Sequence, residues 1–316
     1  MKKSLIALAV AGALTAPIVA QADATLYGVA QFRLIDEDTK SLNANQAKTR
    51  LGVKGTVDND IEGLTTGYQF EWEFSGANND ADGVSDLRKS LVFLKGAYGQ
   101  ATFGQQNNPA AAVKKADVFN RNSGVFSQNS DRIGNAVTYV TPKISGFEAY
   151  AGFTADGADD TSSEDVDSYI VGANYSAGGL GLSVSYNETN NDTTNTDLEV
   201  VGFGASYTMG DLYLGAMYQT TDADALAVDG DGDPINDTDV VDVAVKYNIG
   251  KFTVGAGFVQ EDVDGASDES ERSLVAVNYA LGSSASLNIE YADYNSFAEE
   301  NDQGNDQLVL QYTIGF

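Results

Sequence analysis

The sequence contains neither cysteine nor histidine among its 316 residues. Without cysteine, no disulfide can hold the fold together. Without histidine, the chain lacks the usual general base and the commonest metal ligand. It also shows no nucleophile–base pairing, no phosphate-binding glycine loop and no dinucleotide motif. These absences make an enzyme the weakest functional candidate, and they indicate no organic cofactor.

Long hydrophobic runs are scarce as well. The N-terminus has two lysines, Lys2 and Lys3, before the apolar run Leu5–Ala13, and small residues follow it. This pattern predicts a cleaved secretory signal peptide over residues 1–22. No later run stays apolar for the length of a transmembrane helix, so residues 23–316 are expected to contain none. An exported chain of this kind is either soluble or crosses a membrane as a closed β-barrel, which satisfies every backbone group in lipid.

Positive charge is scarce in the second half of the chain. Residues 23–146 carry 13 basic and 14 acidic side chains, whereas residues 147–316 carry 3 basic and 32 acidic ones. Such acidity argues against nucleic-acid binding, which needs a basic surface. The acidic residues either lie in solvated external loops, as suits high salt, or capture cations. We favour solvated loops, because net charge bears mainly on solubility.

Short segments with alternating side chains fill most of the mature sequence. In Gln307–Phe316, apolar Leu308, Leu310 and Tyr312 alternate with polar Gln307 and Gln311. This alternation predicts strands with one apolar and one polar face, and lengths near 10–12 residues fit strands tilted across a bilayer. The sixteen segments are 24–36, 47–58, 62–75, 86–97, 100–106, 131–141, 146–155, 166–177, 179–189, 197–209, 211–222, 238–249, 251–262, 270–281, 284–295 and 306–316.

The connections between these segments alternate between short turns and longer polar loops, seven of the first and eight of the second. Short turns at one end and long loops at the other are typical of outer-membrane barrels. We therefore predict an all-β fold, a 16-stranded antiparallel transmembrane β-barrel formed by residues 23–316 as one domain. Sixteen strands leave an aqueous lumen. A soluble sandwich is the alternative, but it would not alternate its connections so strictly.

One long segment, residues 107–130, breaks the alternation. It contains Pro109 and a short alanine run and is long for a connection. Long irregular loops are usually functional or disordered. We predict that this segment folds into the lumen as a constriction loop. A disordered surface insertion is the alternative.

Several strand motifs together resemble the trimeric general-diffusion porins of Gram-negative bacteria. The motifs are Thr25-Leu26-Tyr27-Gly28, Arg50-Leu51-Gly52-Val53-Lys54-Gly55, Gln69-Phe70-Glu71-Trp72-Glu73-Phe74, Arg88 with Leu94-Lys95-Gly96, Phe103-Gly104 and Arg132–Tyr139. The resemblance implies a homotrimer in the outer membrane, in contact with its lipid and lipopolysaccharide. It also implies that assembly machinery reads the C-terminal strand, which ends on the aromatic Phe316.

Alternation places five basic side chains on the polar, inward faces of their strands. These residues are Arg33, Arg50, Lys54, Arg88 and Arg132. Rings of charged side chains at close quarters control ion selectivity, so we predict a basic wall that sets a field across the lumen. The alternative is that these side chains pair with Glu71, Glu73 and Asp117 and only fix the loop in place. The two roles are compatible.

The constriction loop departs from the family's pattern in its charge. Asp117 is its only acidic residue, and it lies among Lys114, Lys115 and Arg121. The narrowest point would then be basic and favour anions, while acidic vestibules would attract cations over longer range. The sequence favours anion preference.

An acidic repeat occurs in one of the long loops. Asp229, Asp231 and Asp233 alternate with glycine, and Asp237 and Asp239 follow. Carboxylates in such spacing suit Ca²⁺ or Mg²⁺, although the glutamate that ends an EF-hand loop is missing. We favour a solvated acidic turn over a metal site.

The function expected from these observations is an outer-membrane porin, a water-filled channel for passive diffusion of small hydrophilic solutes and ions. One alternative is a solute-selective channel for anions such as phosphate on the same barrel. Another is a non-conducting barrel that serves as an adhesin or envelope anchor. The preferred solute and any gating stay open at this point.

Overall fold

The computed structural model describes residues 24–74, 85–120, 130–155, 157, 165–191, 196–223, 236–301 and 303–316. The strands are β1 Thr25–Glu37, β2 Asn43–Val57, β3 Thr65–Phe74, β4 Ser85–Gly96, β5 Gly99–Asn107, β6 Arg132–Ile133, β7 Ala136–Val140, β8 Phe147–Thr154, β9 Ser168–Ala177, β10 Leu180–Asn191, β11 Thr196–Met209, β12 Leu212–Ala223, β13 Thr238–Ile249, β14 Phe252–Val263, β15 Ser270–Ala280, β16 Ala285–Tyr294 and β17 Gln307–Gly315. Two short helices join them, η1 Pro109–Val113 and α2 Ser296–Glu300.

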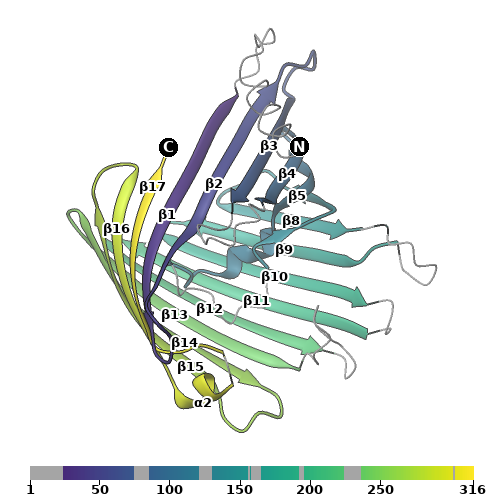
Figure 1. Ribbon diagram of the computed structural model, residues 1–316. Helices are drawn as coiled ribbons and strands as arrows, with labels where there is room; N and C mark the ends of the chain where they lie inside the picture. The colour runs from purple at the N-terminus through teal and green to yellow at the C-terminus, as the bar shows by residue number, and fades with distance from the viewer. Residues whose placement is uncertain are drawn as a thin grey trace, which may run out of the picture.

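The strands form one closed antiparallel barrel (Figure 1). Each strand pairs with its neighbours in sequence, and β1 closes the ring by pairing with β17 from Val29–Gly315 to Glu37–Gln307. The short β6 and the following β7 both pair with β5 and together make one of sixteen strands around the ring. The predicted 16-stranded antiparallel barrel is confirmed. Closure leaves no free sheet edge, which satisfies the backbone hydrogen bonds in lipid.

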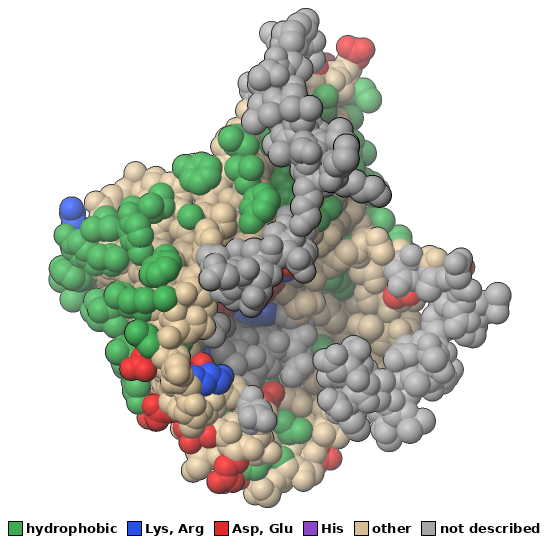
Figure 2. Space-filling model, viewed as in Figure 1, with side chains coloured by type: hydrophobic (Ala, Val, Ile, Leu, Met, Phe, Trp, Pro, Cys, Tyr) green, Lys and Arg blue, Asp and Glu red, His purple; other side chains and the backbone are tan. Residues whose placement is uncertain are grey.

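Burial in this barrel is inverted relative to a soluble protein. The largest fully buried side chains include Gln219, Gln311 and Glu290, whereas Phe203 on β11 is 50% exposed. Many other large apolar side chains are exposed too, and Figure 2 shows them gathered on the outer surface at the left of the view. Alternation along each strand therefore separates an apolar outer face from a polar inner face, as the bilayer requires.

The strand boundaries differ from the predicted ones in a few places. β2 begins at Asn43, four residues before the predicted start, which shortens the first long loop. The predicted strand over 131–141 divides into β6 and β7, because Asn135 between them has a φ of 46°. Helix α2 lies in what was predicted as a plain loop, and the Asn295 side chain caps its first turn by accepting from the Ala298 N–H.

No helix in the described residues is long and apolar enough to cross a membrane. The signal peptide predicted over residues 1–22 lies outside the described part of the chain.

Candidate functional site

The inner faces of β2 and β3 bring opposite charges together. Arg50 on β2 lies directly opposite Glu73 on β3, and Gly52 lies opposite Glu71. Directly paired residues on antiparallel strands point to the same face and lie about 5 Å apart. The alternation of both strands thus fixes a cluster of Arg50, Glu71 and Glu73 on the lumen side.

Arg88 on β4 completes this cluster. Its Nε donates to Glu71 Oε1 at 2.9 Å, and its Nη1 lies 2.9 Å from Glu73 Oε2. Arg50 Nε donates to the same Glu73 Oε2. Charge-assisted bonds of this kind are the strong ones, and a guanidinium that spans two carboxylates also fixes their orientation. The three strands are therefore tied together across the inner wall.

Tyr27 on β1 extends the network and was missed by reasoning from the sequence. Its hydroxyl donates to Glu71 Oε2 at 2.9 Å and accepts from Gln69 Nε2 at 2.6 Å. The ring covers Gly52, where a Cβ would overlap it, and the Lys54 ammonium lies 5.4 Å from the ring centroid. Covering a strand glycine with a neighbouring aromatic ring is a known way to stabilise curved sheets. The exposed Lys54 thus lies at the edge of the cluster.

Three further cations surround the network. Lys48 on β2 lies within electrostatic reach of Arg50 and Arg33. Lys89 on β4 lies near Glu71, and Arg132 on β6 lies near Arg88 and Arg50. The inward position of Lys48 follows from alternation, because it lies two residues before Arg50. The position of Lys89 does not follow from alternation, because the register of β3 and β4 shifts at a bulge between Glu71 and Trp72.

The wall built by β1–β4 and β6 is therefore basic in balance. Its cations are Arg33, Lys48, Arg50, Arg88, Lys89 and Arg132, and the carboxylates near them are Glu71, Glu73, Asp86 opposite Glu73 on β4, and Asp131 next to Arg132. Both predicted roles of the arginines fit this geometry, because Arg50 and Arg88 pair with carboxylates while the cations of the whole wall still outnumber its acids.

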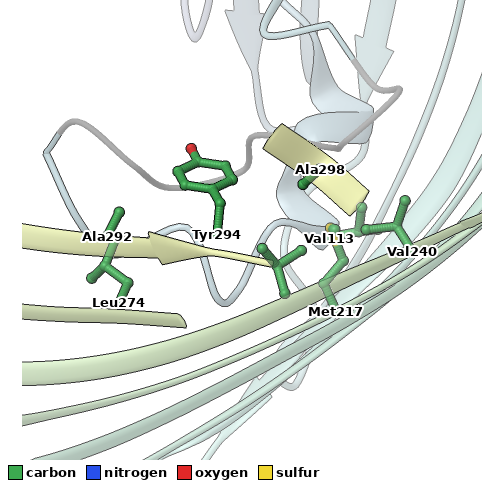
Figure 3. Close-up of a cluster of buried hydrophobic side chains, with 8 residues drawn as sticks. Val113, Met217, Val240, Leu274, Ala292, Tyr294 and Ala298 are labelled. Atoms are coloured by element: carbon green, nitrogen blue, oxygen red, sulfur yellow. The ribbon is translucent and has the colours of Figure 1, made fainter. Parts of the chain in front are cut away.

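The segment after β5 starts with well-anchored backbone. The Asn108 N–H donates to the Asp131 carbonyl at 2.9 Å, and the Ala110 N–H donates to the Asn108 side chain at 2.9 Å. These bonds hold the two ends of the segment together and cap η1. Val113 at the end of η1 then packs in a buried apolar cluster with Met217 and Val240 of the wall (Figure 3).

Glycines on the inner face allow the backbone of the segment to lie close to the wall. A Cβ on Gly204 of β11 or Gly215 of β12 would overlap the carbonyls of Val113 and Lys115. The Lys115 carbonyl also accepts a hydrogen bond from the Tyr213 hydroxyl at 2.7 Å. The segment's backbone therefore lies directly on β11 and β12, on the face opposite the lipid-facing side chains.

Asn120 connects the segment to the seam of the barrel. Its N–H donates to Glu290 Oε1 of β16 at 2.6 Å, and its carbonyl accepts from Arg33 Nη2 of β1 at 3.4 Å. Arg33 Nε in turn donates to Gln311 Oε1 of β17 at 2.6 Å. The Asn120 backbone thus contacts side chains of β16 and β1, the two strands that flank β17. Glu290 was not singled out from the sequence, although its alternation with Ile289 and Tyr291 marks it as inward.

The charged residues of the segment lie in different environments. Lys114 Nζ lies 3.0 Å from Asp131 Oδ1, and Asp117 is exposed. Burial by itself would raise the pKa of Asp131, but the hydrogen bond and charge of Lys114 hold this pKa below its usual value. Lys115 contributes its carbonyl to the contact with Tyr213. Arg121 lies outside the described residues.

The acidic repeat is only partly described. Asp229, Asp231 and Asp233 lie outside the described residues. Asp237 accepts from the Ala223 N–H at 2.8 Å, and Asp239 accepts from the Tyr218 hydroxyl at 2.9 Å. Among the described residues, no group of three acidic side chains is arranged to hold a metal ion. The Ca²⁺ or Mg²⁺ site stays a prediction.

Comparisons with known proteins agree with this geometry. The outer membrane porin protein 32 of Delftia acidovorans is 32% identical over 49% of this chain and 50% of its own length. The major outer membrane protein P.IB of Neisseria gonorrhoeae is 29% identical over 60% of this chain and 59% of its own. The chain thus spans about half to three-fifths of the length of these relatives.

A solved structure, an anion-selective porin from Comamonas acidovorans, superposes with a TM-score of 0.73 at 19% identity. It covers 94% of this chain and 100% of that one, and it shows the same fold. The relatives and the barrel place the protein in the bacterial outer membrane. The family model described as Gram-negative porin matches residues 7–298, and the chain therefore belongs to the Gram-negative porin family.

Proposed function

We propose that the protein forms a water-filled channel for passive diffusion of small hydrophilic solutes and ions across the outer membrane. The observation that carries this proposal is the inverted burial of a closed barrel, with Gln219, Gln311 and Glu290 buried on the lumen side. A polar bore of sixteen strands is wide enough to hold water. Passage through it needs no bond making, which agrees with family membership and with the absent catalytic residues.

The segment 107–130 would set the width of this channel. Support comes from the contacts of Val113, Lys115 and Asn120 with the inner faces of β11, β12 and β16. A segment held at several points along its length keeps a fixed distance from the basic wall. Solutes would pass between the two.

We propose that the channel prefers anions. The wall of β1–β4 and β6 has more cations than carboxylates, and it acts at contact distance on a passing ion. Glu290 and Asp242 of the second half also lie on the inner face, but Glu290 accepts from the Asn120 N–H and Asp242 lies near Arg272. The acidic loop residues act from farther away, and screening over about 10 Å at 0.1 M salt weakens them more. Anion preference should therefore increase with ionic strength. A solute-selective anion channel is the second candidate, favoured by the same wall.

Assembly and partners are proposed from the family. A homotrimer would bury outward apolar side chains of the first strands, such as Leu26, Phe32 and Val92, which are exposed in the single chain. The remaining outer surface would contact membrane lipid and lipopolysaccharide. The terminal Phe316 would be read by the assembly machinery, and residues 1–22 would be the cleaved signal peptide.

Current through the purified protein in a planar bilayer tests the channel. Under a roughly tenfold KCl gradient, set once around 0.1 M and once around 1 M to change the screening, we expect large steps in groups of three. The reversal potential should lie on the chloride side and move further toward it at the higher salt. A saturable conductance for phosphate would favour the selective channel. The absence of steps, or a potential near the potassium value at both salts, would contradict the proposal.

A further inference from the structure

A polar pocket lies between the segment and the part of the wall formed by β13–β16. It has a volume of about 290 Å³ and lies between Val118–Asn120 and the inner faces of β13–β16. This volume is at the small end of the range for ligand pockets, which suits a molecule smaller than a drug. The basic wall belongs to β1–β4 and β6, and it meets this pocket where Arg33 donates to the Asn120 carbonyl.

Small residues make the wall hollow at this point. Gly255 of β14 and Ala276 of β15 lie side by side in one cross-strand row, between Lys246 of β13 and Glu290 of β16. A Cβ on Gly255 would lie 2.7 Å from the ring of Phe119, so this ring covers the glycine. The pocket therefore has an aromatic side wall and a shallow centre.

The next row of the wall supplies a neutral polar floor. Thr253 lies opposite Asn278, and Asn278 lies opposite Asn288, with Ser286 two residues before Asn288 on β16. Asn288 is 3% exposed, and its Oδ1 has no hydrogen-bond partner. An unpaired buried acceptor is unfavourable unless a ligand or water donates to it. Asn288 Oδ1 is thus an atom of the floor that lacks a hydrogen-bond donor.

The charges at the two sides of the pocket are opposite. Lys246 and Glu290 are separated by three strand spacings, which is about 14 Å between their backbones. Glu290 already accepts from the Asn120 N–H, and Arg33 donates to the Asn120 carbonyl, so both of these charges are engaged by the segment. The span from Lys246 to Glu290 is far longer than the distance between the charges of an amino acid. Neutral amides and hydroxyls fill the space between them.

We propose that this pocket binds a neutral polyhydroxylated solute of monosaccharide size. A hydroxyl both donates and accepts, so one ring of hydroxyls can donate to Asn288 Oδ1 and accept from the Asn278 amide and the Lys246 ammonium. The apolar face of such a ring can lie on Phe119. Binding here would retain a sugar next to the narrowest part of the channel. That consequence for transport rests on the proposed channel, whereas binding itself does not.

Equilibrium dialysis of radiolabelled D-glucose against the detergent-solubilised full chain measures binding directly. We expect saturable binding with one site per chain. Asn288→Ala should weaken it about fivefold, the factor that one neutral hydrogen bond contributes. Ala276→Leu should abolish it by filling the hollow. Asn45→Ala is the matched control, because Asn45 on β2 also has an unpaired buried Oδ1 but lies outside the pocket, and its affinity should equal that of the wild type.

Three results would overturn the proposal: uptake that rises linearly with glucose, equal weakening by Asn288→Ala and Asn45→Ala, or displacement by glycine as effective as by unlabelled glucose. The last would assign the pocket to zwitterions. Bilayer recordings separate this inference from the proposed function. Saturable binding without current steps would support the sugar pocket and contradict the proposed channel. Current steps without saturable binding would support the channel and contradict the sugar pocket.

Discussion

Phe316 and Gly28 close the barrel together. The Gly28 N–H donates to the Phe316 carbonyl at 2.9 Å, and the Phe316 N–H donates to the Gly28 carbonyl at 3.1 Å. The Phe316 ring also lies over Gly28, where a Cβ would overlap it and come within 2.7 Å of the Arg50 carbonyl. The first and last strands thus meet at a position that accepts only glycine.

Enlarging Gly28 should therefore weaken the seam. Gly28→Leu must displace both a ring and a backbone carbonyl, and such overpacking destabilises by about 1–3 kcal/mol. The midpoint of heat unfolding, followed by the shift in electrophoretic mobility, should fall. Gly282→Leu is the control, because a Cβ at Gly282 meets nothing within 4 Å. Equal midpoints for the two variants would show that the seam tolerates the added side chain.

Arg88 should govern ion selectivity, because it bridges Glu71 and Glu73. Arg88→Met removes one positive charge and uncovers two carboxylates, so the reversal potential should move toward the potassium value. Glu73→Gln should move it toward the chloride value. Each charged hydrogen bond lost from Arg88 also contributes about 1.5–3 kcal/mol of stability. Lys40→Met, which removes a cation from an exposed pair with Glu37, should leave the potential unchanged. An unchanged potential in Arg88→Met would exclude this residue from the filter.

Gly215 should control the width of the channel without changing its charge. A Cβ there overlaps the Lys115 carbonyl, so Gly215→Ala must move the segment away from β12, against overpacking of about 1–3 kcal/mol. We expect a changed single-channel conductance with an unchanged reversal potential. Gly134→Ala, next to the segment but with open space around its Cβ, should conduct like the wild type. A wild-type conductance in both variants would show that the segment does not limit flow.

The Lys114–Asp131 pair should make the segment sensitive to acid. Lys114 holds the pKa of Asp131 below its usual value, so the pair's contribution is complete above about pH 3.9 and is lost as pH falls through the lower pKa of the folded protein. The Asp131 side chain is 71% exposed, and an exposed pair contributes less than about 1 kcal/mol. Asp131→Asn should therefore melt slightly below the wild type at pH 6. The difference should shrink as the pH falls below about 3.9 and vanish once the pH is below the lower pKa of folded Asp131, and a difference that persists in still stronger acid would point to another cause.

The strands could be predicted from the sequence because lipid outside and water inside impose a period of two on every one of them. The inward positions of Arg33, Arg50 and Arg88 followed from the same rule. The break at Asn135 could not be predicted, since a single left-handed residue leaves no periodic signal. The bulge beside Glu71, which places Lys89 in the basic cluster, leaves none either.

Contacts across the lumen could not be predicted from the sequence for a different reason. Gly204, Gly215 and Gly255 read as strand glycines that permit twist, but they are the positions where the segment lies on the wall. Alternation gives the side on which Glu290 points, yet its partner is the Asn120 N–H, 170 residues away. Such pairs depend on the path of one irregular segment, and no local pattern encodes that path.

The double attachment of Asn120 has a consequence for the order of events during assembly. Glu290 and Arg33 belong to strands on either side of β17, so both can hold Asn120 only after the ring has closed. The segment comes from the middle of the chain, and once the ring is complete it could enter only through an open end. The simplest sequence has it inside before β17 joins β1, and the last strand then closes around it. A barrel that closed first would have to take in its own interior segment through an open end.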